Sequence, residues 1–138
     1  MKFYIYALAI ITILLSSCNR ENNQIPYAPV DFTIYISDPQ WINLSVPGGW
    51  EYVSGGSKGI ILFRTNLDEI MAYERHCPYQ PDNNCKIHVD SSWITATDTT
   101  CCGTTFNLYN GSVTSGVSTL PLKAYQTIFD GEILRVIN

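Results

Sequence analysis

Two short segments decide the fold of this chain: Cys77-Pro78-Tyr79, and Thr99-Thr100-Cys101-Cys102-Gly103-Thr104-Thr105-Phe106. Each follows a run of residues typical of a β-strand, and each is predicted to be a loop. The two segments contain three of the five cysteines of the chain. The strand-like runs on either side of these loops indicate the fold class.

Short apolar runs separated by turn residues extend through most of the chain. Ile60-Ile61-Leu62-Phe63 is typical of a buried strand, and Asn110-Gly111 is typical of a hairpin turn. The predicted strands cover residues 30–36, 41–46, 50–53, 58–64, 70–74, 87–89, 93–96, 106–108, 111–113, 122–129 and 132–137. No window after the N-terminal segment shows helical periodicity. Many short strands at close spacing predict an all-β antiparallel sandwich or small barrel.

The N-terminal segment has the features of a secretory signal. Lys2 is followed by an apolar run from Phe3 to Leu15, which is too short for a permanent membrane span. The sequence Leu15-Ser16-Ser17-Cys18 resembles the lipobox of bacterial lipoproteins, and this resemblance implies lipidation of Cys18. An ordinary signal peptide with an incidental cysteine is the alternative. We therefore expect a signal peptide at 1–17, a flexible tether at 18–28, one domain at 29–138, and a membrane-anchored location in a bacterial envelope, facing the periplasm or the cell surface.

Charge and motif content exclude several function classes. The formal net charge is −4, and it becomes −5 when Lys2 leaves with the signal peptide. An acidic chain without basic clusters disfavours nucleic-acid binding, which needs a positive stripe. Residues 55–59 lack the spacing of a phosphate-binding loop and are predicted to be a turn. His76 and His88 are too far apart for a histidine zinc motif, and both are expected to be structural.

Four cysteines remain when the predicted lipidation site is set aside: Cys77, Cys85, Cys101 and Cys102. An even number of cysteines in an exported domain indicates two disulfide bonds. Cys101 and Cys102 are neighbours, and neighbouring side chains in an extended segment point in opposite directions, so separate partners suit them.

The two loops resemble the cluster-binding loops of Rieske 2Fe–2S domains. Arg75-His76-Cys77-Pro78 resembles the first loop of the family, and Gly103 with Phe106 aligns the second. The segments 107–111 and 119–125 resemble the continuation of the family pattern, so the resemblance runs from Ile60 to the C-terminus. It implies a Rieske-like β-sandwich or small barrel that carries a subdomain formed around the two loops.

The four ligand positions depart from the family pattern. A Rieske cluster uses two thiolates and two imidazoles, supplied as Cys-x-His and Cys-x-x-His-Gly. The corresponding residues here are Cys77, Tyr79, Thr99 and Cys102, so only Cys77 is retained in kind. A tyrosine phenol with a pKa of about 10 and a threonine hydroxyl are poor ligands for iron. The resemblance therefore implies a member of the family that has lost its cluster and holds no metal or other cofactor.

The same resemblance implies a disulfide pattern. Cys77 and Cys102 occupy positions that converge on the cluster from opposite loops, so a Cys77–Cys102 bond would replace the metal. Cys101 aligns with the loop-clamping cysteine of the family, and its partner would be Cys85. The Cys77–Cys102 bond closes a loop of about 25 residues, for which the chain-entropy model gives at most about 3.5 kcal/mol.

The function implied is that of a non-catalytic, lipid-anchored envelope domain with a structural or interaction role. Its expected partners are the membrane, through Cys18, and an unknown envelope protein. One alternative is an electron-transfer protein with an atypical 2Fe–2S cluster on Cys77, Cys102 and two of Cys85, Cys101 and Tyr79. A zinc site formed by four cysteines is another alternative. An oxygenase is disfavoured because it needs a further domain with a mononuclear iron.

Overall fold

The computed structural model describes residues 24–138. The predicted signal peptide at 1–17, the lipidation site Cys18 and the first part of the predicted tether lie outside the described residues. From residue 24 onward, no helix is both long enough and apolar enough to cross a membrane.

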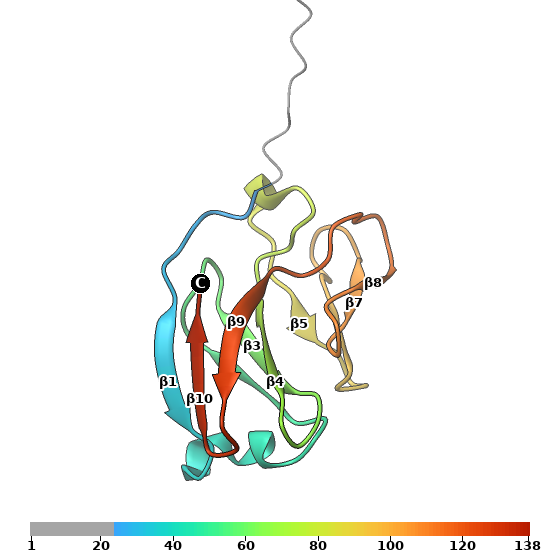
Figure 1. Cartoon of the computed structure of the whole chain (residues 1–138). Helices are drawn as coiled ribbons and strands as arrows, with labels where there is room; N and C mark the ends of the chain where they lie inside the picture. The colour runs from blue at the N-terminus through green and yellow to red at the C-terminus, as the bar shows by residue number, and fades with distance from the viewer. Residues whose placement is uncertain (1–23) are drawn as a thin grey trace, which may run out of the picture.

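The larger of two sheets has six strands in the order β1-β10-β9-β4-β3-β2 (Figure 1). Every pair of neighbours in this sheet is antiparallel. The strands are β1 (Asp31–Tyr35), β2 (Trp50–Val53), β3 (Ile60–Arg64), β4 (Ile70–Glu74), β9 (Ala124–Phe129) and β10 (Ile133–Ile137). The turns between β3 and β4 and between β9 and β10 form at the predicted places.

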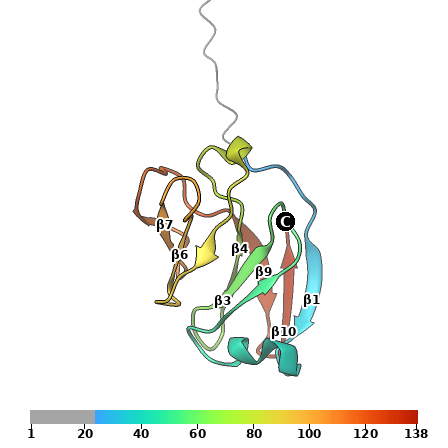
Figure 2. The same ribbon diagram turned by 180° about the vertical axis from the view of Figure 1, so that it is seen from behind.

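The smaller sheet has four strands in the order β5-β6-β7-β8 and lies away from β1 and β10 in both views (Figures 1 and 2). Its strands are β5 (His88–Val89), β6 (Thr95–Thr97), β7 (Thr105–Asn107) and β8 (Val113–Ser115). This sheet and the loops around it form a subdomain. The prediction of an all-β antiparallel fold is confirmed, and the division into a large sheet and a two-loop subdomain agrees with a Rieske-like arrangement.

Strand β3 shows how the sequence separates two hydrophobic cores. All five of its residues are buried, and alternate residues point to opposite faces of the sheet. Ile60 and Leu62 pack into a first core with Ile34 of β1 and Val136 of β10. Because β1 and β3 are not neighbours in the sheet, their shared core shows that the six-stranded sheet curls around it.

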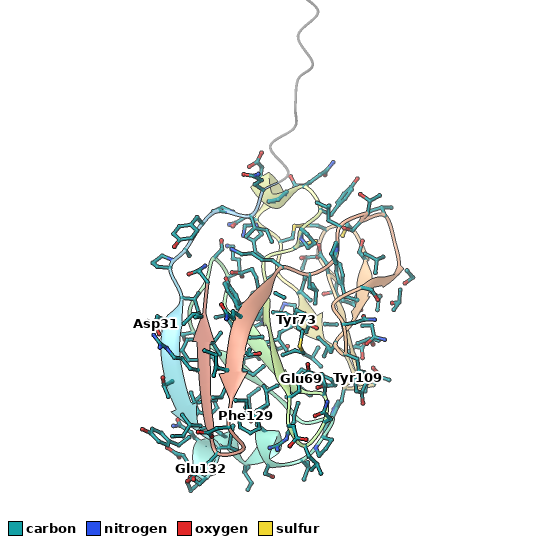
Figure 3. All side chains as sticks on the ribbon, viewed as in Figure 1. Asp31, Glu69, Tyr73, Tyr109, Phe129 and Glu132 are labelled. Atoms are coloured by element: carbon teal, nitrogen blue, oxygen red, sulfur yellow. A yellow bond between two sulfur atoms is a disulfide. The ribbon has the colours of Figure 1, made fainter. Side chains whose placement is uncertain are left out.

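Ile61 and Phe63 point to the other face of β3 and enter a second core with Tyr73. The subdomain supplies the opposite side of this core through Ile87, Ala96, Phe106, Leu108 and the two cysteines Cys77 and Cys85. Figure 3 shows Tyr73 between the large sheet and the subdomain, with Tyr109 on the subdomain side. The second core therefore fixes the subdomain, and with it the two loops, against the large sheet.

One predicted strand is wrong, and the start of another is misplaced. Residues 41–46 were expected to be extended, but residues 41–45 belong to the 3₁₀ helix η1 (Pro39–Ser45), and only Val46 after it is extended. Asp38 caps this helix by accepting a hydrogen bond from the Gln40 amide, and Pro39 suits its first turn. The strand predicted at 93–96 begins two residues later, as β6 at Thr95, because Trp93 adopts φ 65° in the turn before it. Local capping and turn geometry outweigh β-propensity at both places.

Candidate functional site

The first cysteine loop leaves the end of β4 and doubles back toward β5. His76 and Lys86 form an isolated antiparallel bridge, and the Cys77 amide donates to the Cys85 carbonyl over 3.1 Å. The short 3₁₀ helix η2 (Pro81–Asn83) forms the tip of the loop. This pairing brings Cys77 and Cys85 to opposite arms of one narrow loop, although seven residues separate them in the sequence.

The second cysteine loop joins β6 to β7 and is organised by Asp98. The Oδ1 atom of Asp98 accepts hydrogen bonds from the amides of Thr100 and Cys101 at 3.1 and 3.0 Å and from the Thr100 hydroxyl. The Gly103 amide donates to the Asp98 carbonyl, and Gly103 adopts φ 64° to close the turn. Asp98 is therefore the cap residue of this loop, and it holds both cysteines of the loop in place.

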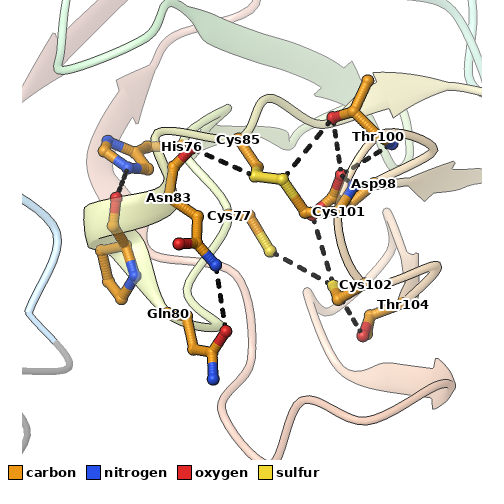
Figure 4. Close-up of a disulfide and its surroundings, with 11 residues drawn as sticks. His76, Cys77, Gln80, Asn83, Cys85, Asp98, Thr100, Cys101, Cys102 and Thr104 are labelled. Carbon is orange, nitrogen blue, oxygen red and sulfur yellow. Dashed lines mark hydrogen bonds between the residues drawn. A yellow bond between two sulfur atoms is a disulfide. The ribbon is translucent and has the colours of Figure 1, made fainter.

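A disulfide joins the two loops (Figure 4). It links Cys85 to Cys101, with 6.2 Å between their Cα atoms. This is one of the two pairs that the Rieske resemblance implies. Since Cys85 is buried in the second core, the bond clamps the second loop onto the core of the domain.

The expected Cys77–Cys102 disulfide is not formed in the structure, where both residues are thiols with their sulfur atoms 3.7 Å apart. The Cys102 sulfur lies 3.3 Å from Asp98 Oδ2 and 3.1 Å from Thr104 Oγ1, so its proton has an acceptor on its own loop. A bond would need the sulfurs to approach to about 2.05 Å. The structure brings the predicted partners together, and their covalent pairing stays a prediction.

Burial controls the chemistry of these groups. Cys77 is fully buried, and burial raises the pKa of its thiol far above the ordinary range, so the neutral thiol is favoured. Burial also raises the pKa of Asp98, but hydrogen bonds from the Cys101 amide, the two neighbouring thiols and the Thr100 amide outweigh that effect. The pKa of Asp98 is therefore below its ordinary value. The site pairs a buried neutral thiol with an ionised carboxylate.

The other two predicted ligand positions contribute nothing to this cluster. Tyr79 is half-buried and packs against the second core, and Thr99 is exposed. Within residues 24–138, the groups able to share a metal ion here are Cys77, Asp98 and Cys102, whose donor atoms all lie within 4.8 Å of one another. Asp98 was not recognised from the sequence as a potential ligand. Its position directly before Thr99 in the second loop was the available signal.

The two histidines are engaged elsewhere. His76 is buried, and its ring nitrogens contact Ser57 Oγ and the Pro81 carbonyl, both at 2.8 Å. His88 is exposed, with Nδ1 located 3.2 Å from an Arg75 Nη2. Neither belongs to the described groups that could share a metal with the cysteines. Both histidines have structural contacts, as expected.

These residues do not fit a Rieske cluster. The cluster needs two thiolates and two imidazoles, whereas the meeting point of the loops offers two sulfurs and one carboxylate. One oxygen of that carboxylate already accepts three hydrogen bonds from its own loop. The other pair of sulfurs is consumed by the Cys85–Cys101 bond.

Comparisons with known proteins find similarity among the solved structures. Among the solved structures, the chain is similar to the ferredoxin of carbazole 1,9a-dioxygenase from Nocardioides aromaticivorans IC177, with a TM-score of 0.49 and 16% identity. The similarity covers 79% of this chain and 96% of that chain. No protein-family model matches this chain, and no curated protein matches it. At this identity and TM-score, the likeness assigns no role to any residue of this chain.

Proposed function

We propose that this protein is a metal-free, Rieske-like domain that is anchored to a bacterial envelope membrane through lipidated Cys18 and has a structural or interaction role with another envelope protein. In the Rieske family the two loops hold a cluster, whereas in this protein they are linked directly to each other. Disulfide bonds supply the clamping that a cluster would otherwise give. The domain is proposed to be non-catalytic.

The donor set at the meeting point of the two loops carries this proposal. Cys77 and Cys102 stand at ligand positions that would bind different irons of one cluster, but their sulfurs are only 3.7 Å apart. This sulfur–sulfur distance of 3.7 Å is short enough for later formation of a disulfide, whereas two irons and two sulfides need more space between their ligands. An exported protein meets an oxidising environment, which favours that closure.

The proposal is tested on the full chain produced with export in a bacterial host and purified in a non-ionic detergent without reductant. We expect no stoichiometric iron, zinc or acid-labile sulfide, and a mass increase on Cys18 that matches lipidation. The matched control is a Cys18→Ser chain, which should lack this mass increase and have the same metal content. Stoichiometric iron and sulfide would overturn the proposal.

A second candidate is a domain that binds one metal ion at the same place. Two thiolates bonded to one tetrahedral ion at about 2.3 Å lie about 3.7 Å apart, which is the separation of Cys77 and Cys102. Asp98 would be the third protein ligand, with its donor oxygen inside the same cluster. One equivalent of zinc or copper without sulfide would support it over the metal-free domain.

A further inference from the structure

A pocket lined by Arg75 and Lys86, which flank the first cysteine loop in the sequence, gathers positive charge. It has a volume of about 380 Å³ and lies between Arg75, Lys86 and the loop 54–59, which joins β2 to β3. Residues 24–138 contain six lysines and arginines, and three of them line this pocket: Lys58, Arg75 and Lys86. Such a concentration is unexpected in a chain whose formal net charge is −4.

Arg75 is the central cation of the pocket. Only 7% of the residue is exposed, and its guanidinium lies over the Tyr52 ring, with its central carbon 3.5 Å from the ring centroid. Its Nε donates to the Ile87 carbonyl over 3.0 Å, and one Nη is 3.2 Å from His88 Nδ1. These contacts orient the guanidinium without neutralising it.

No carboxylate of the described residues pairs with Arg75. Within residues 24–138 the one salt bridge is formed by Arg135 and Asp31, and the second Nη of Arg75 has no hydrogen-bond partner there. Burial lowers the pKa of Arg75, and the charges of Tyr52 and Glu74 oppose this effect without a salt bridge. Because no carboxylate is bonded to this largely buried guanidinium, the pocket favours an anion supplied from outside the described part of the chain.

Lys58 and Lys86 add two further positive charges beside Arg75. Burial, followed by repulsion from Arg75 and Lys58, lowers the pKa of Lys86. Glu74 is the nearby acid, but its carboxylate is turned toward other donors: the amides of Ser57, Lys58 and His76, and the hydroxyl of Tyr125. The three cations therefore repel one another without a carboxylate paired to them.

The loop 54–59, called the glycine loop below, is held rigidly beside the three cations. The amides of Ser57 and Lys58 are fastened to Glu74 at 2.6 and 2.9 Å. Gly56 adopts φ 61°, and a Cβ at this position would overlap the Glu74 carboxylate. The loop thus holds Lys58 at the pocket before any ligand arrives, which lowers the entropic cost of binding.

We propose that this pocket binds an oxyanion, namely a phosphate or sulfate group carried by a small molecule or a lipid headgroup. The planar fork of an arginine matches the oxygens of such a group, and two lysines add point charges beside it. The volume exceeds that of a bare ion and falls in the range of small-molecule sites, so the pocket has room for the group that carries the anion. This inference goes beyond the proposed function and does not depend on the state of the cysteines.

The test is an NMR titration of the isotope-labelled full chain in a non-ionic detergent, with the amides of residues 55–59 as reporters. The probes are inorganic phosphate, inorganic sulfate, glucose 6-phosphate and dihexanoyl phosphatidylglycerol, with glucose as the uncharged control. We expect saturable shifts of these amides below about 10 mM for at least one anionic probe and none for glucose. The probe that binds most tightly identifies a free ion, a soluble phosphate ester or a lipid headgroup as the source.

Matched variants distinguish a specific anion site from a general effect of net charge. Lys58→Gln and Lys86→Gln should each weaken binding about tenfold, because each removes a charged hydrogen-bond donor. Lys123→Gln changes the net charge equally, but it lies outside this pocket and should weaken binding less than about twofold. Both lysine variants keep Arg75 and its packing contacts, so they are expected to fold. Absence of saturable shifts with every anionic probe, or equal weakening in all three variants, would overturn the proposal.

Discussion

Replacement of Glu74 by glutamine tests how the large sheet, the glycine loop and the first cysteine loop are held together. The Glu74 carboxylate is fully buried and accepts four hydrogen bonds. One oxygen accepts from the amides of Lys58 and His76, both at 2.9 Å, and the other accepts from the Ser57 amide and the Tyr125 hydroxyl, both at 2.6 Å. No other described side chain connects the β2–β3 loop, the end of β4 and β9 in this way.

Glutamine keeps the shape of the side chain but replaces one acceptor oxygen with an NH₂ group. In the more favourable orientation of the glutamine, its NH₂ group faces the Tyr125 hydroxyl and the Ser57 amide. The hydroxyl can rotate and accept a hydrogen bond from the NH₂ group, but the Ser57 amide is itself a donor and cannot accept one. One buried amide therefore loses its partner, which costs about 1–3 kcal/mol, and the remaining bonds lose their charge assistance. We expect Glu74→Gln to lower the free energy of unfolding by about 2–4 kcal/mol.

Urea unfolding followed by tryptophan fluorescence, without reductant, measures this loss. With a denaturant slope of about 1.5 kcal/mol/M, the midpoint should fall by about 1.3–2.7 M. Glu132→Gln is the matched control, because Glu132 is exposed and has only a 3.5 Å contact to Ser37, so its effect should stay within about 0.5 kcal/mol. An equally small effect of Glu74→Gln would refute the role given to this carboxylate.

Three further variants test other parts of the account. The double change Cys85→Ser and Cys101→Ser opens a closed loop of 16 residues and should lower the free energy of unfolding by about 3 kcal/mol in the same urea assay; no loss would show that this bond does not clamp the loops. The folded-state pKa of Asp98 is lowered, so its ionisation stabilises the fold above about pH 4, and that contribution is lost as the pH falls through the folded-state value. Asp98→Asn should therefore reduce the difference in unfolding free energy between pH 7 and pH 3, and an unchanged difference would contradict this assignment. Gly56→Ala should destabilise the domain by more than about 1 kcal/mol and shift the amides of the glycine loop, because its Cβ has no space beside Glu74; a neutral effect on urea unfolding would argue against the rigid loop.

The sequence predicts the hairpins well, because their signals are local. Asn110-Gly111 and Asp130-Gly131 need particular backbone angles, and both glycines adopt positive φ in the structure. The sequence shows β3 only as a continuous apolar run and does not reveal which residues point to which core, because both faces of this strand are buried. Residues 41–45 were misassigned because Trp41 and Ile42 favour strands, whereas Asp38 and Pro39 begin a 3₁₀ helix.

The candidate site was predicted only in part. The cysteines that meet were identifiable from a family pattern, but Asp98 was not recognised as the neighbour of two thiols. The basic pocket could not be predicted from spacing, because Lys58, Arg75 and Lys86 are far apart in the sequence and show no charge cluster. They meet because β3 and β4 are paired and because Lys86 bridges back to His76 beside Arg75.

The measurement that tests the central claim most directly is a count of free thiols in the exported full chain. The protein is purified without reductant, denatured in an alkylating agent and weighed intact. The account predicts no alkylation of Cys77, Cys85, Cys101 or Cys102, because both disulfides have formed and no metal holds a thiol. Alkylation of any of these four cysteines would contradict it, and a stoichiometric metal together with alkylated Cys77 and Cys102 would favour the metal-binding candidate.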